Sequence, residues 1–140
     1  MTYLIHAAEE LRGGFPGWVS GLAGISVTPE LFLRLNTIFF AGMVAAVFLA
    51  RYLPGAGWIA VTLAVSVALN GLLHLASTIL TRSYSPGVVS GVLVWIPLGV
   101  FALRSMRARL PRAVFLFAFL GGVGLQVMVS LILLGSGASR

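Results

Sequence analysis

His6, Glu9 and Glu10 form a compact set of ionisable residues near the start of the chain, in the sequence HAAEE. In a helix, residues three and four positions apart lie on one face, so both carboxylates are predicted to lie near the imidazole. Imidazole nitrogens and carboxylate oxygens bind zinc, iron or manganese, and they also exchange protons near neutral pH. The motif therefore predicts a metal site or an acid–base site.

A second set, Asn70 and His74, has the same four-residue spacing further along the chain. In a metal site, His6, His74 and one glutamate would be the protein ligands, with water as the fourth ligand and the other glutamate as general base. Without a metal, the same groups would form an acid and a base held in an apolar pocket. The candidate metal ligands are His6, Glu9, Glu10 and His74, and the candidate catalytic residues are Glu9, Glu10, Asn70 and His74.

Structural roles for these residues are also consistent with the sequence. The first segment could be an interfacial amphipathic helix whose glutamates face water or pair with Arg12. Asn70 and His74 could form hydrogen bonds between membrane helices, which contribute about 0.6 kcal/mol each on average. Arg34 and Arg82 could extend to the membrane surface without taking part in a site.

The composition of the chain determines its class. Of 140 residues, 59% are hydrophobic and 9% are charged, and the mean hydropathy is +1.07. A soluble domain usually has about 25% charged residues and could not bury this much apolar surface. Without cysteine, disulfides and thiolate metal sites are excluded. The chain is predicted to be an integral membrane protein in contact with the lipid bilayer.

Four apolar segments are close to the ~20 residues that a membrane-spanning helix needs. We expect one transmembrane domain over residues 1–140, an all-α bundle of four transmembrane helices plus a short N-terminal helix carrying HAAEE. The short helix is predicted at 3–12, an irregular connection at 13–30, and the spans at about 31–53, 57–80, 87–103 and 113–134. Pro97 predicts a kink or a locally opened backbone in the third span.

This topology places the first segment, the start of the first span, the end of the second span and the loop TRSYSPG on one side of the membrane. The polar residues of these segments are therefore expected to gather around one site, because ionisable groups at membrane depth usually face a bundle interior. The supporting residues predicted there are Arg12, Arg34, Asn36, Arg82 and Tyr84.

The basic residues are all arginines, and Arg104, Arg107, Arg109 and Arg112 lie in one short loop. Their scattering between apolar segments argues against nucleic-acid binding. The positive-inside rule instead places loop 104–112, together with Arg51, in the cytoplasm of a bacterial inner membrane. The opposite side then receives Arg12, Arg34, Arg82 and Arg140.

Small and polar residues recur every fourth position in the last span, at Ala118, Gly122, Gln126 and Ser130. Such a stripe allows another helix to approach closely. We expect it to pack against a neighbouring helix, or alternatively to join two copies in a homo-oligomer.

Three segments of this apolar chain resemble those of a known family: HAAEE near the N-terminus, LRGGFPGW at 11–18 and NGLLHLASTILTRSYSPG at 70–87. It resembles the HXXEE family of small bacterial membrane proteins. The resemblance implies a multi-pass architecture and marks His6, Glu9 and Glu10 as motif positions. It implies no reaction, because the function of the family is unknown.

Two classes of function follow from the residues. The protein is either an enzyme, metal-assisted or acid–base, that acts on a lipid-like or other apolar substrate, or a non-catalytic carrier, receptor or accessory subunit that uses the same residues to bind an apolar small-molecule ligand or to pair helices. A separation of more than about 8 Å between the two imidazoles would exclude one shared metal, because zinc–ligand bonds are about 2.0–2.2 Å long.

Overall fold

The computed structural model describes residues 1–138, in which all regular elements are helices. Arg140, one of the arginines used to predict orientation, lies outside the described residues. The elements are α1 (Thr2–Arg12), α2 (Phe15–Ala23), α3 (Pro29–Tyr52), α4 (Gly57–Thr81), α5 (Val88–Ser90), η1 (Gly91–Trp95), α6 (Ile96–Arg107) and α7 (Arg112–Ala138).

Four helical segments are long and apolar enough to cross a membrane: α3, α4, the continuous segment α5–η1–α6, and α7. Because they match the predicted spans, the prediction of a four-span bundle with a short N-terminal helix is confirmed. The third span is longer than expected and ends at Arg107 rather than 103. Arg104 and Arg107 lie in its last turn, where cations favour the negative end of the helix dipole.

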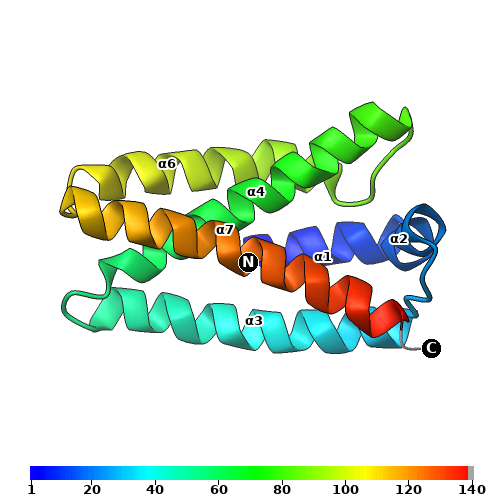
Figure 1. Ribbon diagram of the computed structural model, residues 1–140, viewed down its shortest axis with the longest axis horizontal. Coiled ribbons are helices and arrows are strands. Elements are labelled where there is room, and N and C mark those ends of the chain that lie inside the picture. The colour runs from blue at the N-terminus through cyan, green and yellow to red at the C-terminus, as the bar shows by residue number, and fades with distance from the viewer. Residues whose placement is uncertain (139–140) are drawn as a thin grey trace.

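The spanning helices run side by side, with α4 in the middle of the bundle (Figure 1). α4 packs against α3, η1, α6 and α7, whereas α3 is buried over very little of its length. Exposed apolar side chains such as Val44, Val47 and Phe48 cover α3. In the described residues these surfaces form broad apolar faces that suit hydrocarbon and not water. The chain is therefore an integral membrane protein.

The first two helices differ from what the sequence predicts. Residues 15–23 form α2 within the segment expected to be irregular, and α2 ends at Gly24, whose φ of 66° is in the left-handed region. α1 lies alongside the spanning helices in contact with α3, α5 and η1, so it packs against the bundle (Figure 1). Its buried residues are His6 and Glu10.

The third span widens locally just before its proline. Residues Gly91–Trp95 form one π-helical turn, and Pro97 follows in the first turn of α6. The locally opened backbone predicted from Pro97 is thus present, at the turn N-terminal to it. Gly91 approaches Gly71 of α4 so closely that a Cβ on Gly71 would lie 2.7 Å from the Gly91 carbonyl oxygen. This contact holds the widened turn against the centre of the bundle.

The small-residue stripe of α7 packs within the chain. Ala118 is buried against Val61 and Val65 of α4, and a Cβ on Gly122 would lie 2.5 Å from the Cβ of Val65. The prediction that this stripe packs against a neighbouring helix is confirmed. Within the chain, α4 occupies this face of α7.

Candidate functional site

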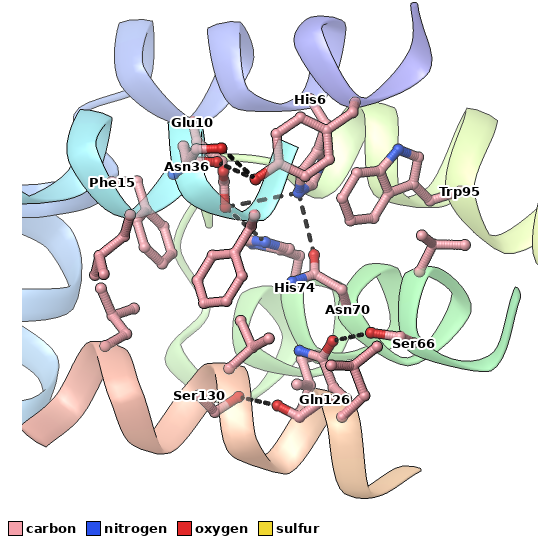
Figure 2. A pocket seen from close by; sticks show the side chains of 18 of the residues that line it. His6, Glu10, Phe15, Asn36, Ser66, Asn70, His74, Trp95, Gln126 and Ser130 are labelled. Atoms are coloured by element: carbon pink, nitrogen blue, oxygen red, sulfur yellow. Dashed lines mark hydrogen bonds and ion pairs between the residues drawn. The ribbon is translucent and has the colours of Figure 1, made fainter. Parts of the chain in front are cut away.

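His6, Glu10 and His74 meet in the interior of the bundle, where α1 faces α4 (Figure 2). The Glu10 carboxylate oxygen Oε1 lies 3.2 Å from Nε2 of His74 and 3.6 Å from Nε2 of His6. All three residues are buried, and their donor atoms lie within 4.8 Å of one another. The imidazole ring centroids are 5.0 Å apart, which is below the limit of about 8 Å beyond which one metal could not be shared.

Each imidazole contacts a buried serine through its other nitrogen. Nδ1 of His6 lies 2.7 Å from Oγ of Ser90, and Nδ1 of His74 lies 3.1 Å from Oγ of Ser85. Asn70 approaches the same site, with its side-chain oxygen 3.1 Å from Nε2 of His6. Partners of this kind fix the orientation of imidazole rings and the nitrogen that carries the proton.

Two further residues fix the positions of the rings. Trp95 stacks on His6 with ring centroids 3.9 Å apart. Gly87 lies against both imidazoles, and a Cβ there would be 2.8 Å from Cε1 of His74 and 3.0 Å from Cε1 of His6. Its φ of 102° is also one that only glycine adopts without strain. The loop before α5 therefore closes one side of the site.

Burial lowers the pKa of His6 below its ordinary value, although the neighbouring Glu10 carboxylate acts in the opposite direction. The imidazole is therefore neutral at neutral pH and keeps one lone pair. A neutral ring beside a carboxylate can share a proton with it, or both can bind one cation.

Glu9 points away from this cluster. Its Oε1 accepts hydrogen bonds from the Tyr84 hydroxyl at 2.8 Å and from the backbone N–H groups of Val89 at 2.9 Å and Gly87 at 3.2 Å. Its Oε2 accepts from the N–H of Ser90 at 2.7 Å. Burial acts to raise the pKa of Glu9, but hydrogen bonds from the side chain and backbone of Ser90, from Tyr84 and from the Val89 N–H outweigh it and lower the pKa to about 2. Glu9 thus holds the start of the third span to α1.

An apolar cavity of about 640 Å³ extends from the cluster between α3, α4 and α7. His6, Glu10, Asn70 and His74 line one end of it. Aromatic and aliphatic side chains form most of the remaining wall, including Trp18, Phe32, Phe39, Met43, Val67, Leu125 and Val129. A cavity of this size and lining is suited to an apolar molecule.

A family model described as a protein of unknown function with an HXXEE motif matches residues 1–102. The matched segment contains the motif residues His6, Glu9 and Glu10 and also His74. This chain belongs to the HXXEE family. No curated protein and no solved structure matches the chain.

For this HXXEE protein, the structure brings together His6, Glu10, Asn70 and His74, which the sequence analysis had singled out. It corrects the expectation that both glutamates join the imidazoles, because the Glu9 carboxylate is directed to the backbone of the next segment. The alternative in which the glutamates pair with Arg12 in water is wrong as well.

The predicted supporting residues have separate positions. Asn36 accepts a hydrogen bond of 2.7 Å from the Tyr3 hydroxyl and lines the cavity, and Tyr84 binds Glu9. Burial, followed by the charge of Glu10, raises the pKa of Tyr3, which therefore stays a hydrogen-bond donor. The other three predicted supporting residues are exposed arginines: Arg12, Arg34 and Arg82. Within residues 1–138, no ion pair joins these arginines to either glutamate of the motif.

Sequence reasoning did not identify Ser85, Gly87, Ser90 and Trp95 as parts of the site. The first three belong to SPGVVS, which reads as a turn followed by the start of a helix. This HXXEE chain has eleven serines, so no feature of the sequence singles out these two. Nothing in the sequence indicates that Trp95 stacks on an imidazole.

Proposed function

We propose that this protein is an intramembrane enzyme that binds one divalent metal ion at His6, Glu10 and His74 and acts on a lipid-like, apolar substrate. The observation that carries the proposal is the convergence of two imidazole nitrogens and one carboxylate oxygen in a buried position at the end of an apolar cavity. Zinc, iron and manganese all accept this donor set.

The distances between the donors support a metal. Ligands about 2.1 Å from a tetrahedral zinc lie about 3.4 Å from one another. The two carboxylate-to-imidazole distances are 3.2 and 3.6 Å. When Nδ1 of each ring donates its proton to serine, the lone pair of His74 Nε2 faces Glu10, and that of His6 Nε2 faces both Glu10 and Oδ1 of Asn70. A cation between these electron-rich atoms would remove their repulsion.

The roles of the residues follow from their positions. His6, Glu10 and His74 would hold the metal, which would leave a fourth coordination position for water or substrate and supply Lewis-acid chemistry. Asn70, beside His6, would position the polar group of the substrate. Ser85 and Ser90 would orient the imidazoles, and the apolar cavity would bind the hydrocarbon part of the substrate and exclude bulk water.

The proposal includes a location. Loop 104–112 with its four arginines, Arg104, Arg107, Arg109 and Arg112, would face the cytoplasm of a bacterial inner membrane. The loop before α5, which closes the site, lies at the opposite end of the third span (Figure 1). The site would then be nearer the outer leaflet of that membrane.

A metal-free acid–base pair is the second candidate, because 3.2 Å between Glu10 and His74 is also suited to a shared proton. In that case Nε2–H of His74 donates to the Glu10 carboxylate, Nε2–H of His6 donates to Oδ1 of Asn70, and the serines donate to Nδ1 of each ring. Glu10 and the imidazoles would transfer protons to and from an apolar substrate. A non-catalytic carrier would use the same cavity without either chemistry.

The test is the metal content of the detergent-purified protein after growth with added zinc, iron and manganese. We expect near-stoichiometric metal in the wild type and its loss in His6→Ala and in His74→Ala. The control is Thr62→Ala, which alters a hydroxyl on the same helix as His74 that contacts the Ala118 carbonyl. This variant should retain the metal.

The absence of metal from a folded, supplemented wild type would overturn the metal proposal in favour of the acid–base candidate. Metal that persists in either histidine variant would show that the two helices do not form one site. Turnover of lipid extracts by the metal-loaded protein, lost in the same variants, separates an enzyme from a carrier.

A further inference from the structure

Gln126 of α7 and Ser66 of α4 form a second polar position in the wall of the cavity. The Ser66 hydroxyl donates a hydrogen bond of 3.0 Å to Oε1 of Gln126. Both side chains line the cavity and are mostly buried, with 5% of Gln126 and 8% of Ser66 exposed. Figure 2 shows this pair on the α4–α7 side of the cavity, away from α1.

The side-chain N–H groups of Gln126 have no hydrogen-bond acceptor among the described residues. Its nitrogen carries two N–H groups, and within residues 1–138 no side chain or carbonyl accepts from them. The nitrogen is nevertheless not sealed off, because no fully buried polar atom in this part of the chain lacks a partner. The amide nitrogen is therefore accessible to a ligand in the cavity that Gln126 lines.

The neighbouring hydroxyl groups cannot donate a hydrogen bond to a ligand, because each already donates its proton within the protein. Ser66 donates to Gln126, and Ser130 donates to the backbone carbonyl of Gln126 at 3.0 Å. The nearby wall is made of apolar side chains such as Leu63, Leu125 and Val129. The Gln126 amide is thus a free donor in an apolar part of the cavity.

The two polar positions of the cavity are aligned along α4. Ser66, Asn70 and His74 follow one another at four-residue intervals, so they share a face of the helix. Eight residues of helix correspond to about 12 Å along its axis. A ligand with its polar head at His74 would therefore have its chain beside Gln126 about 12 Å from that head.

We propose that Gln126 is a substrate-binding residue whose amide donates a hydrogen bond to an oxygen atom within the hydrocarbon chain of the substrate, as a ketone, ester, ether or hydroxyl group. This inference rests on the proposed function, because it assumes that the head of the substrate lies at His6, Glu10 and His74. It identifies the substrate class as an oxygenated long-chain lipid.

The probes for a test are stearic acid and a series of stearic acids with one keto group at successive chain positions. Their affinities are measured by displacement of radiolabelled stearic acid from the zinc-loaded full-length protein in phosphatidylcholine nanodiscs. We expect one positional isomer to bind about five- to tenfold more tightly than stearic acid, the ratio that one neutral hydrogen bond supplies. In Gln126→Leu this ratio should fall to about one.

Equal affinity for all isomers in the wild type would overturn the inference and leave Gln126 as a contact between helices. Retention of the preference in Gln126→Leu would also overturn it. Gln126→Met, which keeps an unbranched side chain, provides a second variant if the leucine variant does not fold. Zinc content, measured on the same samples, should equal that of the wild type in both.

His74→Ala separates the inference from the proposed function. If the cluster holds the head group, this change weakens stearic acid and all keto isomers alike. Unchanged binding in His74→Ala together with a lost isomer preference in Gln126→Leu would contradict the proposed function and support the role of Gln126.

Discussion

The carboxylates of Glu9 and Glu10 are neighbours in the chain but have different partners. Glu9 accepts hydrogen bonds from one hydroxyl and three backbone N–H groups, so its charge is fully solvated by the protein. Glu10 faces two imidazoles and is more deeply buried. The first arrangement fixes a helix, whereas the second keeps reactive groups together in an apolar cavity. One motif therefore supplies a carboxylate that is bound to backbone N–H groups and a carboxylate that faces two imidazoles.

The largest effect on this comparison is expected from Glu10→Gln. It replaces the proposed anionic ligand with a neutral group of the same size. If Glu10 binds zinc as proposed, zinc binding should weaken at least about 100-fold, because the ligand itself is lost rather than an outer partner. Competition with a chromophoric chelator measures the affinity. Glu9→Gln is the matched control and should change zinc affinity by less than about tenfold. Equal losses in both variants would contradict the division of roles.

Gly87→Ala should be the next most damaging change. The new Cβ would clash with both imidazoles, and the residue would keep a φ of 102°, which costs an alanine roughly 1–3 kcal/mol. We expect loss of zinc and a lower unfolding temperature. Intrinsic fluorescence of the protein in detergent measures the unfolding temperature. Gly124→Ala is the control, since nothing lies within 4 Å of its Cβ position. A Gly87→Ala protein that binds zinc normally would show that the loop does not close the site.

Ser85→Ala and Ser90→Ala should each weaken zinc binding about 10- to 100-fold, because each removes the partner that orients an imidazole. Ser85→Ala leaves the Glu9 contacts intact, whereas Ser90→Ala keeps the backbone N–H bond to Glu9 but removes a hydroxyl that also helps to lower the pKa of Glu9. Isothermal titration with zinc provides the measurement. Ser83→Ala, in the same loop, alters an exposed hydroxyl that contacts Thr81 and should leave the affinity unchanged. Loss of affinity in this control would point to loop disruption.

Glu9 should make stability depend on pH in a defined direction. Its pKa in the folded protein is about 2, below the ordinary 4.5, so its stabilising effect is complete above about pH 4.5 and is lost as the pH falls toward 2. Glu9→Gln should therefore unfold at a lower temperature than the wild type near neutral pH, and the difference should shrink on acidification. Thermal unfolding at a series of pH values tests this. A difference that is independent of pH would contradict it.

The smallest effect is expected for Tyr84→Phe, which removes one of the donors to Glu9 at an exposed position. The loss should be about 0.5–1.5 kcal/mol of unfolding free energy, because three backbone donors remain. Denaturant unfolding in detergent micelles measures it. Zinc affinity should not change, and a marked decrease would mean that the two carboxylates are more closely coupled than their contacts indicate.

Much of the fold was predictable, because the membrane imposes simple requirements on the sequence. Apolar runs of sufficient length, separated by segments such as RYLPGAG and RSMRARLPR, located the spans to within a few residues at most ends. The segment 13–30 was mispredicted because its many glycines suggested a loop. Burial against Phe32 and neighbouring residues instead supports α2 over Phe15–Ala23.

The sequence by itself also determined that His6, Glu10, Asn70 and His74 belong on one side of the membrane, because helix spacing and the alternation of spans leave little choice. Only the tertiary structure decided which glutamate meets the imidazoles. Positions 9 and 10 differ by about 100° around a helix, and either could face His74 until the depth and rotation of α1 are fixed. Those are set by contacts remote in sequence, such as Glu9 with the backbone of residues 87–90 and His6 with Trp95, and no local pattern specifies them.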